Sequence, residues 1–475
     1  MTLHFNQELQ NKYPHLEVSV LKYSDAMKDN DSKRIDSEFF KKEYLEKIEL
    51  LNKCGCICIS DIAEVTDGIH TSIDYSEDSG INLISATSPK ENVFDLSRNV
   101  FISKNAHDKN PRTALKENDV IISTVGTIGN CAVVDKSILP ANSDRHVGII
   151  RINKDYSPHF LSTFLLSKYG RMQTFREATG NVQLNLFIYK LKQIKIPLFP
   201  LEFQQQIEQM VRESHECLEQ SKGLYREAEV LLYRELGLDP ENPLASIKPH
   251  SGSLNISVRP LSQSLNATGR LDSEYYQQKY DEIEKVIKKQ KFAKLSDLVD
   301  MQKSIEPGSE AYQENGIPFI RVSNFNKFGI SDTDIFLDFA EFSQTIKPKK
   351  ETILLSKDGS IGIAYCVKDD GNFITSSALL HLNIKREKQR EILPEYLTLI
   401  LNSILVKLQS ERDSGGSIIA HWRISEIEQI LIPILDISIQ EKIENLIKQS
   451  FTLRKKASEL LQTAKQSVEN AIEKG

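Results

Sequence analysis

The sequence predicts an α+β protein made of two tandem copies of one unit, each a mixed, mostly antiparallel globular domain followed by a long helix. Three observations support this prediction. One repeat offset holds along most of the 475 residues, each copy contains short apolar runs separated by turn residues, and each copy ends in a heptad pattern. An approximate two-fold relation between the copies would make the two helices an antiparallel coiled-coil pair separating the domains.

The repeat is visible in matching phrases along the chain. RIDSEFF begins at Arg34 and RLDSEYY begins at Arg270, 236 residues later, and Gly180 matches Gly416 at the same offset. The glycine turns drift to an offset of 233 before the register returns, as expected when loops change length around a fixed scaffold. Chance similarity would not keep one register over this length, so the chain contains an internal duplication.

The globular parts are rich in predicted strands. The first copy has VIISTV (120–125), CAVVD (131–135) and VGIIRI (147–152), and the second has TILLS (352–356), IAYCV (363–367) and ALLHLNI (378–384). A helical stretch follows in each, at 158–175 and 394–411. The phrases VGTIGN (125–130) and DGSIGI (358–363) contain G-x-x-G, which is too short for a dinucleotide fingerprint and precedes a strand. We therefore predict a hairpin turn in each copy.

Each copy ends in a seam of residues alternately four and three apart, the a/d pattern of a coiled coil. The predicted helix-pair interface consists of Phe203, Ile207, Met210, Leu224 and Leu231 in the first helix and Ile439, Ile443, Leu446, Leu453 and Leu460 in the second. Small residues at other seam positions, such as Ser214 and Cys217, permit close approach of two helices. A helix from Leu201 to Leu236 would span ~54 Å at ~1.5 Å per residue. The alternative is that each helix packs only on its own domain.

The repeat also sets the domain boundaries. We predict a first globular domain over residues 1–200, a first spacer helix over 201–238, and a linker with the start of the second repeat over 239–266. A second globular domain then covers 267–436, and a second spacer helix covers 437–475.

Composition and missing motifs narrow the class of protein. The chain has a net charge of −6, contains no apolar run of the ~18 residues needed to cross a bilayer, and begins without a signal-peptide pattern. Its six cysteines are expected to be thiols in a reducing compartment, so a cytoplasmic protein with no membrane partner is predicted. A P-loop, a G-x-S-x-G phrase, a zinc-protease motif and the signatures of amino-methyltransferases are all absent from the sequence. This absence favours binding over catalysis, and no metal site or catalytic residue is predicted.

Two ordered phrases in each copy resemble the specificity subunit of type I restriction-modification systems. The first copy has KENDVIISTVGTIGN (116–130), followed by TGNVQLNLFIYKLKQIKIPLFPLEFQQQI (179–207). The second has KPKKETILLSKDGSIGI (347–363), followed by SGGSIIAHWRISEIEQILIPILDISIQEKI (414–443). The resemblance covers nearly the whole chain, from about residue 17 to the end.

The resemblance implies a non-catalytic reader of double-stranded DNA. Each globular domain would recognise one half of a split target, and the helices would set the gap and dock two methyltransferase subunits. Those subunits would use S-adenosylmethionine, and motor-nuclease subunits would use ATP and Mg²⁺, so the chain itself would hold no cofactor. The alternatives are a recognition chain of another restriction class, a scaffold or adaptor that never touches bases, and an enzyme with an unrecognised motif.

Local charge supports DNA binding in the first copy. Residues 98–195 contain 15 Lys and Arg against 7 Asp and Glu, whereas residues 343–432 contain 12 against 11.

Base reading needs polar side chains on loops held by a scaffold. The predicted DNA-contacting residues of the first copy are His70, Thr71, Ser72, Arg98, Lys104, Arg112, Arg145, His146, Arg176, Asn181, Gln183 and Asn185. Those of the second copy are Gln302, Lys303, Ser304, Arg321, Asn324, Asn326, Lys357, Ser360, Arg412, Ser417, His421 and Arg423.

Two other features are assigned to the scaffold. Trp422, the only tryptophan, is expected in the core rather than stacked on a base. The segments 34–36 and 270–272 share Arg and Asp, and domains that read different DNA would share scaffold but not specificity. We therefore assign these two segments to structure or to methyltransferase docking.

Overall fold

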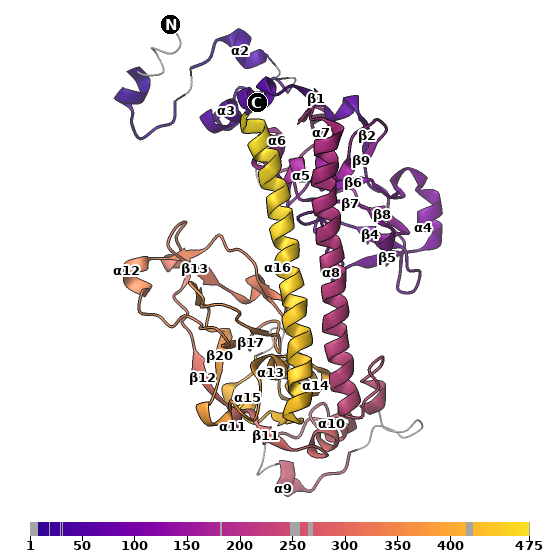
Figure 1. Ribbon diagram of the computed structural model, residues 1–475, viewed down its shortest axis with the longest axis vertical. Helices are drawn as coiled ribbons and strands as arrows, with labels where there is room; N and C mark the ends of the chain where they lie inside the picture. Colours follow the sequence, from indigo (N-terminus) through magenta and orange to yellow (C-terminus); the bar gives the residue numbers. More distant parts are fainter. Residues whose placement is uncertain are drawn as a thin grey trace. The chain divides into compact units, whose positions relative to one another are not determined.

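The computed structural model describes residues 8–18, 20–28, 30, 32–180, 183–247, 257–264, 269–414 and 421–474. The chain divides into two compact units, Met1–Leu218 with Arg454–Gly475, and Glu219–Leu453. Each unit takes one segment of α8 (Leu201–Glu235) and one of α16 (Ile437–Lys474) (Figure 1). Within the described residues, none of the helices is both long and apolar enough to cross a membrane.

The first unit contains a four-stranded antiparallel sheet in the order β2-β9-β6-β7. Its strands are β2 (Ala63–Asp67), β9 (Val147–Ile152), β6 (Val120–Ser123) and β7 (Cys131–Val133). A second sheet, β3-β5-β4-β8, consists of β3 (Tyr75–Ser76), β5 (Val100–Ile102), β4 (Asn82–Ile84) and β8 (Ala141–Ser143). A two-stranded pair joins β1 (Cys56–Cys58) to β10 (Lys195–Pro197).

The first unit also contains short helices. They are α2 (Tyr23–Met27), α3 (Lys42–Lys53), α4 (Lys104–Lys109), α5 (Pro158–Leu166), α6 (Lys168–Glu177) and α7 (Ile188–Leu191). Of these, α5 and α7 contact strands of the four-stranded sheet. Helix α5 packs on β6 and β7 with all but its first residue buried. The resulting apolar cluster joins Val120 and Phe160 to Ile207 of α8 and Val468 of α16.

The second unit repeats this architecture. Its four-stranded sheet has the order β12-β20-β17-β18, with β12 (Val299–Lys303), β20 (Leu379–Ile384), β17 (Ile353–Ser356) and β18 (Ala364–Cys366). The pair of β11 (Phe292–Lys294) and β21 (Leu431–Pro433) matches β1 and β10. The smaller sheets contain β13 (Ile317–Ile320), β14 (Phe325–Asn326), β15 (Gly329–Ile330), β16 (Phe336–Leu337) and β19 (Ile374–Thr375).

The helices of the second unit follow the same order along the chain. They are α9 (Leu261–Gln263), α10 (Gln278–Lys288), α11 (Leu295–Leu298), α12 (Phe339–Phe342), α13 (Pro394–Leu401), α14 (Ile404–Asp413) and α15 (Ile424–Ile427). Nearly all strand pairs of both units are antiparallel, and the described parallel pairs between named strands, β4 with β8 and β13 with β19, occupy matching positions. The predicted α+β repeat is confirmed, and Trp422 is buried as expected.

The predicted helical stretch of each copy is two helices instead of one. In the first copy the break falls at Ser167, whose side chain accepts a hydrogen bond from the amide of Gly170 and so begins α6. Gly170 is tightly packed, because a Cβ there would lie 2.3 Å from the carbonyl oxygen of Phe164. In the second copy α13 ends before Asn402 and α14 follows Ser403. Hydrophobic periodicity continues through both breaks and therefore did not reveal them.

Helices α8 and α16 run antiparallel. In the first unit the Ser214 hydroxyl donates to the carbonyl of Ala457 at 2.9 Å. In the second unit the hydroxyls of Ser221 and Ser450 lie 2.8 Å apart, seven residues later on α8 and seven earlier on α16. The seam positions that are one heptad apart are all buried, namely Ile207, Ser214, Ser221, Ala228, Ile443, Ser450, Ala457 and Ala464.

The other residues of the predicted helix-pair interface are only partly buried, whereas Cys217 is buried. On several turns the buried residue lies one position further along. Met210, Leu224, Leu231, Leu446, Leu453 and Leu460 are partly exposed, as are Phe203 and Ile439. Val211, Tyr225, Leu232, Ile447 and Val468 are buried in their place, in clusters that include strands and helices of the same unit. Each helix segment thus packs both on the other helix and on the globular part of its unit, so the alternative in which each helix packs only on its own domain is wrong.

Candidate nucleic-acid interface

One end of the four-stranded sheet of the first unit gathers several predicted contact loops. Strands β2 and β6 end there and β7 and β9 begin there, because Asp67 pairs with Gly148, Ser123 with Val147, and Ile122 with Cys131. We call residues 68–72, 124–130 and 144–146 the loop edge of this unit. The β6–β7 turn is the predicted hairpin, with Gly126 and Gly129 at φ of 73° and 83°.

Asp67 binds two of the predicted contact residues at this edge, His70 and Arg112. Its carboxylate is 2.6 Å from Nε2 of His70 and 3.1 Å from a guanidinium nitrogen of Arg112, which also donates to the Asp67 carbonyl. Partial burial raises the pKa of Asp67, but the hydrogen bonds from His70 and Arg112 outweigh it, so the pKa lies below its ordinary value. The side chains of His70 and Arg112 remain exposed at the surface, as do those of Thr71 and Ser72.

Two further segments join this edge. Arg145 is exposed and its Nε lies 3.3 Å from Nε2 of His146, in the turn before β9. Asn185 bridges Val125 of the hairpin turn and exchanges backbone hydrogen bonds with Thr179 at 2.8 and 2.9 Å. The exposed Gln183 lies in this loop. Among the described contacts, none brings Arg98 or Lys104 to the edge, although both are exposed.

The second unit has a loop edge at the same end of its sheet, formed by residues 304–308, 357–363 and 376–378. Asp358 pairs with Lys357 and accepts from Nδ1 of His421 at 2.8 Å. Partial burial raises the pKa of Asp358, but these two partners lower it below its ordinary value. Gln302, Lys303, Ser360 and Arg423 are exposed there, whereas Ser304 is buried.

The remaining predicted residues of the second copy follow β13, at the end where Ser376 donates to the carbonyl of Ile320. The amide oxygen of Asn324 accepts from the backbone of Arg321 at 3.2 Å, so the Asn324 side chain shapes this turn. Asn326 is exposed. Asn181 and Ser417, one predicted in each copy, lie outside the described residues.

Arg176 and Arg412 belong to the scaffold in this structure. Nε of Arg176 donates to the carbonyl of Phe39 at 2.9 Å, its guanidinium carbon lies 3.6 Å from the centre of the Phe39 ring, and its side chain is 11% exposed. Arg412 stacks on Tyr275 at 5.4 Å and pairs with Asp413. These guanidinium groups face their own domains, which corrects the prediction that they point toward DNA. The error arose because residue type and loop position do not reveal a backbone partner more than 130 residues away.

Sequence reasoning named the cations of the loop edges but missed Asp67 and Asp358. Each carboxylate holds one histidine and one Arg or Lys, and so fixes where positive charge is presented. Asp358 lies inside the phrase DGSIGI that the sequence predicts as a turn, but only the folded arrangement shows that these carboxylates pair with residues 45 and 63 positions away.

Both copies of the repeat match one known protein family. A family described as type I restriction modification DNA specificity domain matches residues 55–229 and again residues 287–469. The chain belongs to this family. The two matches coincide with the two copies of the repeat, so the chain carries two DNA specificity domains and has a role in DNA sequence recognition.

Three solved structures are similar to the chain over most of its length. A type I restriction-modification S subunit from M. genitalium is 14% identical, with 88% of this chain and 95% of that chain covered and a TM-score of 0.40. The HsdS subunit from Thermoanaerobacter tengcongensis is 15% identical, with coverage of 88% and 96% and a TM-score of 0.27. A structure concerned with complex assembly and conformational transition of the type I R-M system is 14% identical, with coverage of 88% and 96% and a TM-score of 0.29. No curated protein matches the chain.

Proposed function

We propose that the chain is the specificity subunit of a type I restriction-modification complex, in which each specificity domain reads one half of a bipartite DNA target. The chain performs no chemistry in this proposal. It selects the DNA on which other subunits act, and α8 with α16 sets the distance between the two half-sites.

The observation that carries this proposal is the contrast between scaffold and loop edge in the two units. Strand order, the hairpin turn and the bridges at the edge repeat, so the two domains present loops from equivalent positions. The side chains presented there differ: at matching positions the first unit has His70 and Asn185, where the second has Glu306 and His421. A common scaffold with different polar groups is what two readers of different base sequences require.

The proposed partners are double-stranded DNA, two methyltransferase subunits and motor-nuclease subunits. S-adenosylmethionine, ATP and Mg²⁺ would bind to those subunits and not to this chain. A net charge of −6 fits this division, because positive charge for the DNA backbone would come in part from the partners.

Single-molecule sequencing of methylated DNA tests the proposal. Cells that carry the gene with its neighbouring methyltransferase gene should show a split adenine motif that disappears when this gene alone is deleted. An unchanged methylation pattern would contradict the proposal and favour a scaffold or adaptor. A continuous motif would favour the recognition chain of another restriction class.

A further inference from the structure

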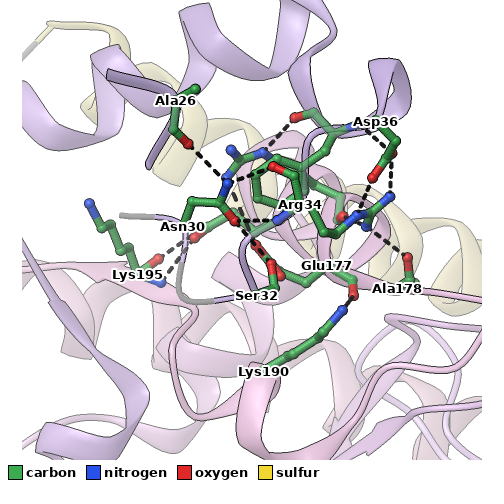
Figure 2. A network of polar contacts seen from close by, with 12 residues as sticks. Ala26, Asn30, Ser32, Arg34, Asp36, Glu177, Ala178, Lys190 and Lys195 are labelled. Carbon is green, nitrogen blue, oxygen red and sulfur yellow. Dashed lines mark hydrogen bonds and ion pairs between the residues drawn. The ribbon is translucent and has the colours of Figure 1, made fainter. Parts of the chain in front are cut away.

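Arg34 binds the end of α6, the helix that precedes the segment joined to the loop edge by Asn185. Its guanidinium makes two hydrogen bonds to Asp36, at 2.7 and 2.6 Å, and one nitrogen also donates to the carbonyls of Arg176 and Ala178, at 2.7 and 3.2 Å (Figure 2). Lys190 donates to the intervening carbonyl of Glu177 at 2.8 Å. Three consecutive carbonyls at the C-terminus of α6 thus accept from cationic side chains, where helix carbonyls lack intrahelical partners.

An aromatic ring completes this arrangement. The Phe39 ring contacts the guanidinium groups of Arg34 and Arg176, with centroid distances of 5.0 and 3.6 Å. The Asp36 carboxylate accepts from the amide of Phe39 at 3.2 Å, which holds the ring beside both arginines. We call Arg34, Asp36, Phe39 and Arg176 the arginine clamp.

The second unit contains the same arginine clamp 236 residues later. Arg270 makes two hydrogen bonds to Asp272, at 2.8 and 2.6 Å, and donates to the carbonyls of Arg412 and Asp413. The Tyr275 ring lies 4.7 Å from Arg270 and 5.4 Å from Arg412. Glu426 stands at the position of Lys190 and accepts from the amide of Arg423. Among the described contacts, Arg270 is therefore the cationic side chain that donates to the carbonyls at the end of α14.

The clamp lies directly before a segment that joins the loop edge through Asn185. Thr179 follows the clamped carbonyl of Ala178 and exchanges two backbone hydrogen bonds with Asn185, which bridges the β6–β7 hairpin turn. A Cβ at Gly180 would lie 2.1 Å from the carbonyl of Gln183, so the described part of this segment is tightly turned. Its position is therefore fixed on one side by the hairpin and on the other by the clamp.

We propose that the arginine clamp is the positioning device of each specificity domain, and that Arg34 controls base discrimination in the first half-site through the segment that follows α6. This inference rests on the proposed function. Arg34 itself touches no base. It holds the start of a segment in which the described polar side chains Gln183 and Asn185 would face DNA. Small displacements of such groups remove base-specific hydrogen bonds while leaving phosphate contacts in place.

The geometry explains why arginine is needed at this position. A guanidinium can bind a carboxylate with two parallel hydrogen bonds and still donate to carbonyls from its remaining nitrogen. A lysine ammonium keeps the charge but is a point donor without this fork. Substitution by Lys should therefore loosen the segment without removing the positive charge.

The test is R34K in the complete complex with its methyltransferase partners. Methylation rates would be measured on the wild-type target and on duplexes with single-base changes in either half-site. We expect discrimination in the first half-site to fall by about tenfold, while discrimination in the second half-site stays unchanged. R270K should show the opposite pattern.

The matched control is R151K. Arg151 makes a similar fork with Asp119, at 2.9 and 2.7 Å, but it lies toward the other end of β9. A general loss of stability would affect R151K and R34K alike, whereas the proposal requires that R151K keep discrimination in both half-sites. If R34K does not assemble, F39L removes the ring while leaving the Arg34–Asp36 pair, and should also act on the first half-site alone.

The outcomes separate the two proposals. If the wild-type complex methylates no bipartite target, the proposed function fails. If it does, but R34K keeps its discrimination or loses it equally in both halves, the positioning role of the clamp is overturned.

Discussion

At the residue scale, polar side chains that are identical in the two copies bind backbone groups of the scaffold. Gln173 exchanges hydrogen bonds with both the amide and the carbonyl of Lys195 on β10, and Gln409 does the same with Leu431 on β21. The side-chain oxygen of Gln204 accepts from the amide of Ser157, which precedes α5. That of Gln440 accepts from the amide of Leu393, which precedes α13. A buried amide that satisfies backbone donors and acceptors is costly to replace, which accounts for its retention in both copies.

Polar residues that differ between the copies give the first prediction. Arg145 is exposed at the loop edge of the first unit, so R145A should weaken DNA binding by the complex. If Arg145 contacts a phosphate, the plot of log binding constant against log salt concentration should become less steep by about 1 unit of slope, because one fewer counterion is released. Binding titrations at several salt concentrations measure this. K154A removes the same charge beyond the other end of β9 and should leave both quantities unchanged; equal effects of the two substitutions would contradict the assignment of the edge.

A buried histidine gives the second prediction. His381 is 1% exposed on β20, its Nε2 lies 2.8 Å from the Thr375 hydroxyl, and burial lowers its pKa to about 4. Between pH 6.5 and pH 4 the unfolded chain therefore binds a proton that the folded chain does not, so stability is full above this range and falls as pH decreases through it. The loss should reach roughly 3 kcal/mol near pH 4.

The first unit supplies the matched substitution for this histidine. Ile149 stands at the corresponding place on β9 and pairs with Ile121, as His381 pairs with Leu354. H381I should reduce the acid-induced fall in the free energy of unfolding, measured by thermal or denaturant unfolding between pH 7.5 and 4.5. H15N, which changes an exposed imidazole, is the control. An unchanged pH dependence in H381I would show that other groups cause the acid sensitivity.

At the element scale, the pairing of α8 with α16 is sensitive to small residues. The Ser214 hydroxyl binds the carbonyl of Ala457, and the Ser450 hydroxyl binds the carbonyl of Ser221, at 2.9 and 2.8 Å. The two contacts correspond at an offset of 236, because Ser214 matches Ser450 and Ser221 matches Ala457. S221A therefore recreates in the second unit the pair already present in the first, and should cost less than about 1 kcal/mol.

S450A removes the donor from the same pair. It should cost about 1–2 kcal/mol, because a buried carbonyl and the Ser221 hydroxyl both lose a partner. Denaturant unfolding of the two variants compares them directly. If S221A lowered the free energy of unfolding as much as S450A, the prediction that a Ser–Ala pair can replace the Ser–Ser pair in the second unit would be wrong.

The sequence predicted the elements better than the side-chain contacts. Two G-x-x-G turns were sufficient to place both hairpins, because only a few turn types accept positive φ at fixed spacing. Heptad spacing identified Ile207 and Ile443, but placed Met210 and Leu446 where Val211 and Ile447 are buried. The spacing gives the direction of an apolar face, whereas packing on strands of the same unit widens that face. The partners of Arg176 depend on tertiary structure, so local sequence could not reveal them.

At the scale of the whole molecule, duplication supplies two domains with one scaffold, and each domain can change its loop edge independently. The continuous helices α8 and α16 each contribute one segment to each unit, so the two units share this pair of helices. In the proposed function, recognition of bases and spacing of the half-sites are therefore carried by different residues, and each should respond separately to mutation.

Lengthening both helices by one heptad tests this separation. Residues 214–220 and 450–456 lie opposite each other in the antiparallel pair, and each begins at a buried seam serine. Duplicating both segments keeps the seam in phase and adds ~10.5 Å at ~1.5 Å per residue, which corresponds to about 3 base pairs at ~3.4 Å each. Methylation sequencing should then show unchanged half-sites with a spacer longer by about 3 base pairs.

A single duplication, in α8 alone, is the control for this prediction. It leaves one helix seven residues longer than its partner and should reduce stability and methylation without producing a new spacer. If the double duplication is stably folded and still methylates the original target with the original spacer, α8 and α16 do not set the distance between the half-sites.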